Sequence, residues 1–281
     1  MQCAWESLIS VLPSWMRSQV DKLGREELQE LRFRLQAPPV LITRRGPVYL
    51  DRIVREEDIS FCINAASRYS PWSAETMASG YLTAPGGHRI GLCGDAVIKA
   101  GEMTGIRNIH MACIRVARDF PGLSNAVPTS GSILIIGPPG SGKTTFLRDL
   151  IRRYSCSQKG SIAVADERQE LFPFVAGECF FDAGKHTDIM SGCPKYICIP
   201  TLLRTMGPAT IAVDEITASQ DCDALIEARW CGVDVLATAH AANLQDLRTR
   251  KIYQPLLHDG LFDAIIVINR DKSWHLEGVN K

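Results

Sequence analysis

The most constraining feature of this sequence is a glycine-rich segment that follows a short apolar run in the second half of the chain. Residues 132–136 read Ser-Ile-Leu-Ile-Ile, and residues 137–144 complete the pattern G-x-x-x-x-G-K-T. An amphipathic helical pattern follows, so the segment lies between a predicted strand and a predicted helix. This context predicts a phosphate-binding loop inside an α/β domain.

Each residue type in this loop suits the binding of phosphate. Glycines let the backbone turn tightly and direct N–H groups at phosphate oxygens, beside the positive end of the following helix. Lys143 is expected to neutralise the β- and γ-phosphates, and the hydroxyl of Thr144 is expected to bind Mg²⁺. A chance Gly-Pro turn is the alternative, which the flanking strand and helix disfavour. The residues predicted to hold nucleotide are Gly137, Pro138, Pro139, Gly140, Ser141, Gly142, Lys143, Thr144 and Thr145.

The identity of the nucleotide is less constrained, because such a loop recognises phosphate and not the base. No Asn-Lys-x-Asp signature occurs in the chain, and residues 269–272 carry Asn-Arg-Asp-Lys, with the letters in another order. The sequence therefore favours ATP over GTP.

A second apolar run ends in a pair of carboxylates. Residues 210–213 precede Asp214 and Glu215, an order that places acids at the carboxyl edge of a parallel sheet, beside the phosphate loop. Asp214 is predicted to hold Mg²⁺ through water, and Glu215 to orient and polarise the water that attacks the γ-phosphate. The alternative role for either residue is a helix cap, since a helix is expected to begin near residue 216.

Two further strand ends carry polar side chains. Glu167 follows the run at residues 161–165 and is a candidate to position Mg²⁺ or water, while the neighbouring Arg168 could instead pair with these acids. The segment 235–240 ends in a hydroxyl and in the imidazole of His240, groups able to bind a γ-phosphate and to transmit its loss. The alternative for His240 is a purely structural role at a loop.

The spacing of apolar runs predicts two domains. Continuous Ile, Val and Ala runs at residues 132–136, 161–165, 210–213, 233–237 and 264–268 are typical of a parallel sheet covered by helices on both faces. Before them, we expect an amphipathic helix at 25–35, a hairpin at 44–47, a helix at 56–69 and Gly-rich strands across 86–118. A Pro- and Gly-containing linker at 119–131 divides a smaller α+β domain, 1–125, from an α/β domain, 126–281.

Composition limits the classes of partner. The 31 basic and 31 acidic side chains balance, so no overall charge attracts nucleic acid or an anionic membrane. The ten cysteines lie scattered in apolar runs, as reduced core residues do, and Cys193 and Cys198 lack the second pair of a zinc ribbon. A signal peptide is not expected, and no stretch approaches the roughly 18 apolar residues of a membrane helix. We expect a cytoplasmic protein that meets a membrane only through partners.

The order of these motifs resembles that of the bacterial secretion and pilus-motor ATPases, a RecA-like hexameric family. Residues 202–215 resemble its arginine-bearing helix and acidic strand, and residues 224–240 resemble the segment that ends in its histidine box. The resemblance implies a RecA-like core and a homo-hexamer. The candidate catalytic residues remain those that the motifs indicate: Glu215, Lys143, Glu167 and His240. Those motors generally carry Gly before the catalytic Glu, so the metal role of Asp214 rests on general phosphate-loop chemistry alone.

A closer resemblance covers nearly the whole chain. The segments 28–35, 87–94, 114–118 and 166–168 are similar to those of the stage III AA family of sporulation proteins. That resemblance implies an ATPase on the mother-cell side of a developing endospore. Its implied partners are membrane proteins of the channel between mother cell and forespore.

Arginines outside the loop are further candidates. The motor family often directs arginines near the linker toward nucleotide, and Arg107, Arg115 and Arg118 lie in such positions, while Arg204 could serve a neighbouring subunit. A solvated surface face is the alternative for each. Two other functions stay open. One is a nucleic-acid-dependent RecA-like ATPase, which is disfavoured because the sequence lacks a basic stripe interleaved with aromatic residues. The other is a scaffold that binds ATP without turnover.

Overall fold

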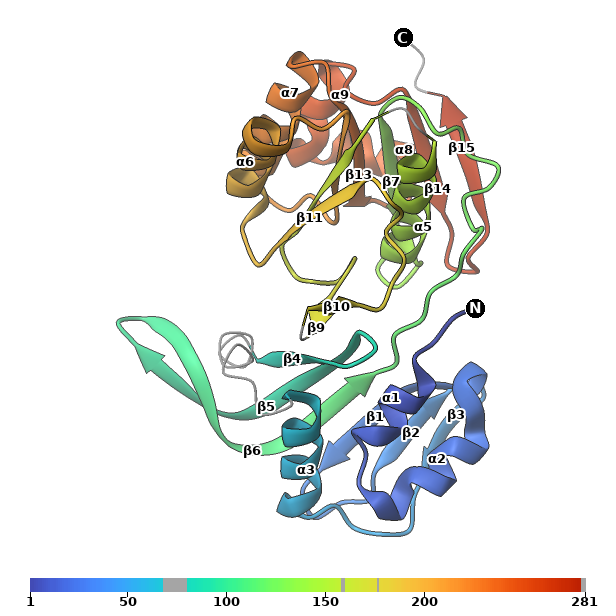
Figure 1. Ribbon diagram of the computed structural model, residues 1–281, viewed down its shortest axis with the longest axis vertical. Helices are drawn as coiled ribbons and strands as arrows, with labels where there is room; N and C mark the ends of the chain where they lie inside the picture. Colours follow the sequence, from blue (N-terminus) through green and yellow to red (C-terminus); the bar gives the residue numbers. More distant parts are fainter. Residues whose placement is uncertain (68–79, 158–159, 176, 279–281) are drawn as a thin grey trace. The chain divides into compact units, whose positions relative to one another are not determined.

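The computed structural model describes residues 1–281 except 68–79, 158–159, 176 and 279–281. The described residues form two compact units, labelled by element in Figure 1. Unit 1 consists of Met1–Asp119 and Pro173–Phe181, and unit 2 consists of Phe120–Phe172 and Asp182–Lys281. The chain thus returns to unit 1 once after leaving it. The two folding domains expected on either side of residue 125 stay a prediction.

Unit 1 is an antiparallel sheet with helices on one face. The strand order is β3-β2-β1-β6-β5-β4. Alternate side chains of these strands, among them Leu31, Phe33 and Ile114, form one buried cluster with apolar side chains of the helices. The elements are α1 (Trp5–Ser10), α2 (Ser14–Glu27), β1 (Leu28–Arg34), β2 (Val40–Thr43), β3 (Gly46–Tyr49), α3 (Glu56–Ser67), β4 (Tyr81–Ala84), β5 (His88–Lys99) and β6 (Glu102–Arg115).

The helix expected at residues 25–35 is wrong: α2 ends at Glu27 and β1 begins at Leu28. The three-residue spacing of Leu28 and Leu31 also suits one face of a helix. In the structure an irregularity in the β1–β2 register between Leu28 and Glu30 adds one residue to the strand, so both leucines are buried. A bulged strand can therefore imitate a helical spacing over a short segment.

Other expectations for the first half agree with the structure. The turn at 44–47 joins β2 to β3, which pair in antiparallel register, and the Gly-rich segment forms the β5–β6 hairpin. The helix expected at 56–69 is α3, and residues 68–69 lie outside the described residues. The returning segment adds a small hairpin, β9 (Phe174–Val175) and β10 (Glu178–Cys179).

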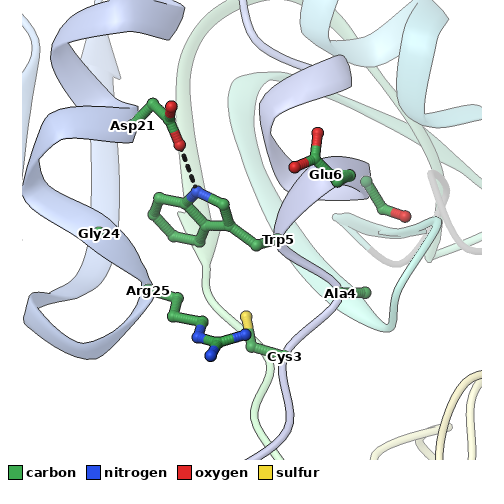
Figure 2. Close-up of a pocket in the computed structure, with 8 residues that line it drawn as sticks. Cys3, Ala4, Trp5, Glu6, Asp21, Gly24 and Arg25 are labelled. Atoms are coloured by element: carbon green, nitrogen blue, oxygen red, sulfur yellow. Dashed lines mark hydrogen bonds between the residues drawn. The ribbon is translucent and has the colours of Figure 1, made fainter.

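A hollow of about 490 Å³ lies beside α1 and α2 in unit 1. Figure 2 shows side chains that line it. Trp5 on α1 donates from Nε1 to Oδ1 of Asp21 on α2, at 2.7 Å. Cys3 and Arg25 also line this hollow, and burial raises the pKa of the Cys3 thiol although Arg118 and Arg25 act against it. The Trp5–Asp21 hydrogen bond links the two helices across the hollow.

Unit 2 is a seven-stranded sheet in the order β11-β8-β12-β13-β7-β14-β15. All neighbouring strands are parallel except β14 and β15, which are antiparallel. Each of the five predicted apolar runs coincides with a strand of this sheet, so the expected α/β architecture is confirmed. The strands are β7 (Ile133–Gly137), β8 (Ile162–Asp166), β11 (Thr187–Ser191), β12 (Thr210–Val213), β13 (Asp234–His240), β14 (Ala264–Ile268) and β15 (Trp274–Gly278).

Helices of unit 2 cover the sheet and complete its core. They are α5 (Lys143–Cys156), α6 (Lys195–Met206), α7 (Ser219–Trp230), α8 (Leu244–Thr249), α9 (Gln254–His258) and a 3₁₀ turn (Lys251–Tyr253). All ten cysteines are free thiols. Across the parts of the chain that the structure describes, no helix is both long and apolar enough to cross a bilayer.

Candidate nucleotide-binding site

The phosphate loop lies between β7 and α5, at the carboxyl ends of the parallel strands. Gly137 ends β7 at a position where a Cβ would lie 2.5 Å from the carbonyl oxygen of Ile268 and 2.6 Å from Oγ of Ser141. Gly140 and Gly142 adopt φ values of 72° and 101°, a region that side chains disfavour. The glycines of the loop are therefore required by its backbone geometry.

Lys143 is buried at the start of α5 and is held by the loop itself. Its Nζ donates to the carbonyl oxygens of Gly137 and Pro138, at 2.9 and 3.1 Å, and lies 3.0 Å from Nδ1 of His240. Burial lowers the pKa of this amine, and Asp214 and Glu215 act in the opposite direction. These two carbonyl groups therefore hold the ammonium group of Lys143 inside the loop.

Asp214, at the end of β12, is linked through hydroxyl groups to helix α5 and to strand β13. Thr144 on α5 donates from Oγ1 to Oδ2 of Asp214 at 2.7 Å, and Thr238 on β13 donates to Oδ1 at 2.6 Å. Thr238 is fully buried. The carboxylate that follows β12 therefore holds the hydroxyl of the loop threonine beside it.

Glu215 is constrained both in its backbone and in its side chain. It adopts φ 53°, a left-handed conformation that is uncommon for residues other than glycine, and its N–H donates to Oγ1 of Thr238 at 2.8 Å. One carboxylate oxygen lies 2.9 Å from Nε2 of His240, and the other accepts from Arg168 at 3.0 Å. A strained backbone held by side-chain contacts is a frequent feature of functional sites.

His240 connects the lysine of the loop with the glutamate after β12. Its Nδ1 faces Nζ of Lys143 and its Nε2 faces the carboxylate of Glu215. A donor on one side and an acceptor on the other assign a neutral ring with its proton on Nε2. His240, at the end of β13, is therefore in contact with both Lys143 and Glu215.

The second acidic segment is held by a lysine that sequence reasoning missed. Lys195, buried at the start of α6, donates to Oε2 of Glu167 and lies 3.9 Å from Oδ2 of Asp221 on α7. Glu167, Arg168, Asp214 and Glu215 line one narrow pocket together with Lys195. The pocket thus brings together the residues that follow β8 and those that follow β12, beside the buried ammonium group of Lys195.

Asp166 has a structural role in this arrangement. Its carboxylate accepts from the backbone N–H groups of Glu170, Leu171 and Phe172, at 2.9, 3.1 and 2.9 Å. Burial nevertheless raises the pKa of Asp166 to about 6. Arg148 on α5 donates to carbonyl oxygens of the same loop, which is therefore tied to the phosphate-loop helix.

The candidate arginines lie in different places. Arg107 and Arg115 belong to β6 and Arg118 follows it, all in unit 1, whereas Arg204 is exposed on α6 of unit 2. The guanidinium of Arg118 donates to carbonyl oxygens of Arg25 and Leu28, and thereby links the chain end of β6 to the start of β1. Their roles toward phosphate stay predictions.

The residues of the loop fit a bound phosphate and a Mg²⁺ ion. Among the described residues, α5 has no side-chain cap at its N-terminus, and the buried Oγ of Ser141 has no hydrogen-bond partner. The first-turn N–H groups of a helix without a cap remain available to an anion. The Thr144 hydroxyl and the Asp214 carboxylate supply the oxygen ligands that Mg²⁺ prefers.

Sequence comparison extends over nearly the whole chain. The family model for sporulation stage III, protein AA, matches residues 6–279. Stage III sporulation protein AA of Bacillus subtilis (strain 168) is 34% identical over 279 residues, which cover 94% of this chain and 91% of that protein.

Solved structures share the fold. The pilus retraction motor PilT with bound ADP matches with a TM-score of 0.63 and 15% identity, over 100% of this chain and 84% of PilT. The Legionella pneumophila ATPase DotB matches with a TM-score of 0.61 and 16% identity, over 94% of this chain and 79% of DotB. The predicted fold class, a RecA-like P-loop core with a smaller α+β part, is confirmed.

Proposed function

Because the chain belongs to the sporulation stage III protein AA family, we propose that it is a Mg²⁺-dependent ATPase that acts in endospore formation. One observation carries the proposal. The ammonium group of Lys143 in the phosphate loop is linked through His240 to the carboxylate of Glu215. This chain of contacts joins a group suited to phosphate with a group suited to activating water.

Each residue has a defined task in this proposal. Lys143 exchanges the carbonyl oxygens of the loop for oxygens of the β- and γ-phosphates of ATP. Thr144 and Asp214 would hold Mg²⁺, which would offset the negative charge of the phosphates. Glu215 accepts a proton from the attacking water and keeps it in line with the γ-phosphate. Glu167, fixed by Lys195, helps to order water at the same edge of the sheet.

His240 couples binding to catalysis in this mechanism. In the structure, its Nδ1 faces Lys143 and its Nε2 restrains Glu215. When Lys143 turns to phosphate, Nδ1 of His240 loses its donor, and the ring becomes free to rotate toward the γ-phosphate. The carboxylate of Glu215 is then released from one of its two restraints.

Assembly and location complete the proposal. We infer a homo-hexamer in which Arg107, Arg115 and Arg118, or Arg204 from a neighbour, contact phosphate, since guanidinium groups remain charged and fork onto phosphate oxygens. The ring works in the cytoplasm of the mother cell, against membrane proteins of the channel to the forespore. The family relation supports this location.

The test compares the wild-type chain with Glu215→Gln and Lys143→Ala. Glu215→Gln is expected to keep ATP affinity and to lower kcat by about 100-fold or more, because a general base is removed. Lys143→Ala is expected to weaken ATP binding itself, measured by equilibrium titration with a fluorescent ATP analogue. If wild type binds ATP without turnover, the chain is a scaffold; if single-stranded DNA raises turnover severalfold, the nucleic-acid-dependent alternative replaces this proposal.

A further inference from the structure

One face of the unit 1 sheet is not covered by any of the helices that the structure describes. Along β1, β4, β5 and β6, the side chains that alternate with the core residues are exposed or half-buried. We call this set the open face. It consists of Glu30, Arg32 and Arg34 on β1, Met111, Cys113 and Arg115 on β6, Arg89, Gly91 and Cys93 on β5, and Tyr81 and Thr83 on β4.

The open face is positively charged in a chain that is neutral overall. It carries four arginines and a single acid, Glu30, while the whole sequence balances 31 basic against 31 acidic side chains. Glu30 lies in an ion pair with Arg32 and 3.8 Å from Arg115, so one carboxylate serves two guanidinium groups. The local excess of positive charge favours a partner that supplies carboxylates or phosphates.

The register places like charges opposite each other. Arg89 on β5 is the cross-strand partner of Arg115 on β6. Directly opposed like charges destabilise an antiparallel pair. Arg89 lies over the ring of Tyr81, with its guanidinium carbon 4.0 Å from the ring centroid.

A hollow of about 350 Å³ lies on the open face beside the arginines. Its lining includes Arg32 and Arg34 on one side and Cys93, Met111 and Cys113 on the other, with Gly91 among them. A Cβ added to Gly91 would find its nearest atom, the carbonyl oxygen of Cys113, at 3.9 Å. The missing side chain therefore leaves an apolar space bordered by guanidinium groups.

We propose that the open face is a docking site for an acidic polypeptide segment of a partner protein. Carboxylates of the segment contact Arg32 and Arg34, and one apolar side chain occupies the hollow over Gly91. Guanidinium groups suit this role because they bind carboxylates through two parallel hydrogen bonds. This interaction goes beyond nucleotide hydrolysis and does not require it.

The chemistry of the open face favours polypeptide over nucleic acid. Proteins that bind single strands stack bases on open aromatic rings. On β1, β5 and β6 the described side chains of this face include no aromatic ring, and Arg89 covers the ring of Tyr81 on β4. The hollow accepts an isolated aliphatic side chain better than a base that must stack.

The test measures peptide binding to the full chain by fluorescence anisotropy. The probe is a labelled peptide, Asp-Glu-Asp-Leu-Asp-Glu-Asp, compared with an Asn/Gln version of the same peptide and with a peptide in which Gly replaces Leu. Binding of the acidic probe is expected to weaken with added salt. The double variant Arg32→Glu/Arg34→Glu is expected to weaken it by at least about tenfold.

Two further variants separate charge from shape. Arg44→Glu/Arg45→Glu makes the same change of charge at the β2–β3 turn, where Arg45 is 87% exposed, and is expected to bind the probe like wild type. Gly91→Val fills the hollow with a β-branched side chain that suits a strand, and is expected to reduce affinity for the leucine peptide to that of the glycine peptide. Circular dichroism and thermal melting confirm that each variant is folded.

Several results would overturn the proposal. Equal losses in the turn variant would show unspecific attraction, and equal binding of the Asn/Gln peptide would remove the role of charge. Tighter binding of a single-stranded oligonucleotide would assign the face to nucleic acid. Self-association of wild type that disappears in Arg32→Glu/Arg34→Glu would assign it to a second copy. A lower affinity for ATP in that double variant would assign it to nucleotide, whereas a wild type without ATPase activity would leave the docking proposal standing.

Discussion

Replacement of Asp166 by Asn is expected to remove a pH dependence from the stability of unit 2. The carboxyl group of Asp166 is 2% exposed at the end of β8, and burial raises its pKa from 3.8 to about 6. Three backbone N–H groups donate to it and Arg148 lies near, and both effects oppose the rise. The shift means that folding disfavours the charged form of this side chain.

The sign and size follow from proton linkage. Between pH 4 and about pH 6 the folded chain holds a proton on Asp166 that the unfolded chain has lost, so the free energy of unfolding falls as pH rises. The slope reaches about 1.4 kcal/mol per pH unit, and the full loss by pH 7 is about 3 kcal/mol. Below pH 4 both states are protonated, and the contribution is fully present there.

Two measurements check this reasoning. Carbon-13 NMR of the aspartate carboxyl groups, assigned with Asp166→Asn, should show one carboxyl that titrates near pH 6. Urea unfolding of wild type and variant at pH 4.5 and pH 7 should give a stability difference that changes with pH in the direction stated above. Any loss of hydrogen bonds in Asp166→Asn changes the free energy of unfolding of the variant by the same amount at pH 4.5 and at pH 7. It therefore does not affect how the stability difference changes with pH.

Asp149 provides a matched control with the opposite sign. It is also buried, which acts to raise its pKa, but hydrogen bonds from Ser124, Gly122 and Arg152 lower it below the ordinary value. Its stabilising effect is therefore present above pH 4 and is lost as pH falls through the folded pKa. If Asp166 titrates below pH 4.5, or if both aspartates give the same sign, the assignment of burial as the dominant cause is refuted.

Two further changes test packing in each unit. Lys195→Met removes the cation beside the partly exposed Glu167 carboxylate and the buried Asp221 carboxylate, and is expected to lower the free energy of unfolding by about 1–3 kcal/mol; an unchanged urea midpoint would contradict the contact. Gly86→Ala requires a side chain at φ 86° with its Cβ 2.5 Å from Cβ of Ala4. Gly86→Ala is expected to lower the free energy of unfolding, measured by thermal unfolding, by more than about 1 kcal/mol. The loss is expected to be clearly larger than that of Gly101→Ala, where φ is 84° and no atom lies within 4 Å.

The architecture of unit 2 could be predicted from the sequence because its signals are local and agree with one another. Each apolar run is long enough for a strand and is buried on both faces, which leaves little freedom for another assignment. The carboxyl ends of these strands meet at one edge, so the positions of Asp214, Glu215 and His240 near the loop followed from strand order. In unit 2, the pattern of apolar residues and the order of the strands therefore predict the same arrangement.

The first half was harder because its signals conflict. In β1 the register irregularity between Leu28 and Glu30 changes the period of burial within a strand of seven residues. A segment of that length cannot distinguish a bulged strand from a helix, and only pairing with β2 and β6 decides between them. Gly24, at φ 78° near the end of α2, was a local signal that the helix does not continue.

The contacts between side chains were beyond sequence reasoning for a different reason. Lys195 follows a Pro in an unremarkable segment, and nothing in its neighbours indicates that it meets Glu167, which lies 28 residues earlier. Its burial beside two carboxylates results from the packing of α6 against both β8 and α7. A lysine at the start of a predicted amphipathic helix, on the side of the apolar residues, is the signal that could have been used.

The residue before the proposed catalytic glutamate shows how this chain differs from the motors that it resembles. Asp214 accepts from Thr144 and Thr238, so its carboxylate fixes a loop hydroxyl and a strand hydroxyl at once. Thr238 also accepts from the N–H of Glu215, which holds that residue in its left-handed conformation. A glycine at 214 would leave the fully buried Thr238 hydroxyl without this acceptor, at a cost of about 1–3 kcal/mol. The carboxylate is thus part of the support for Glu215, whatever its role toward Mg²⁺.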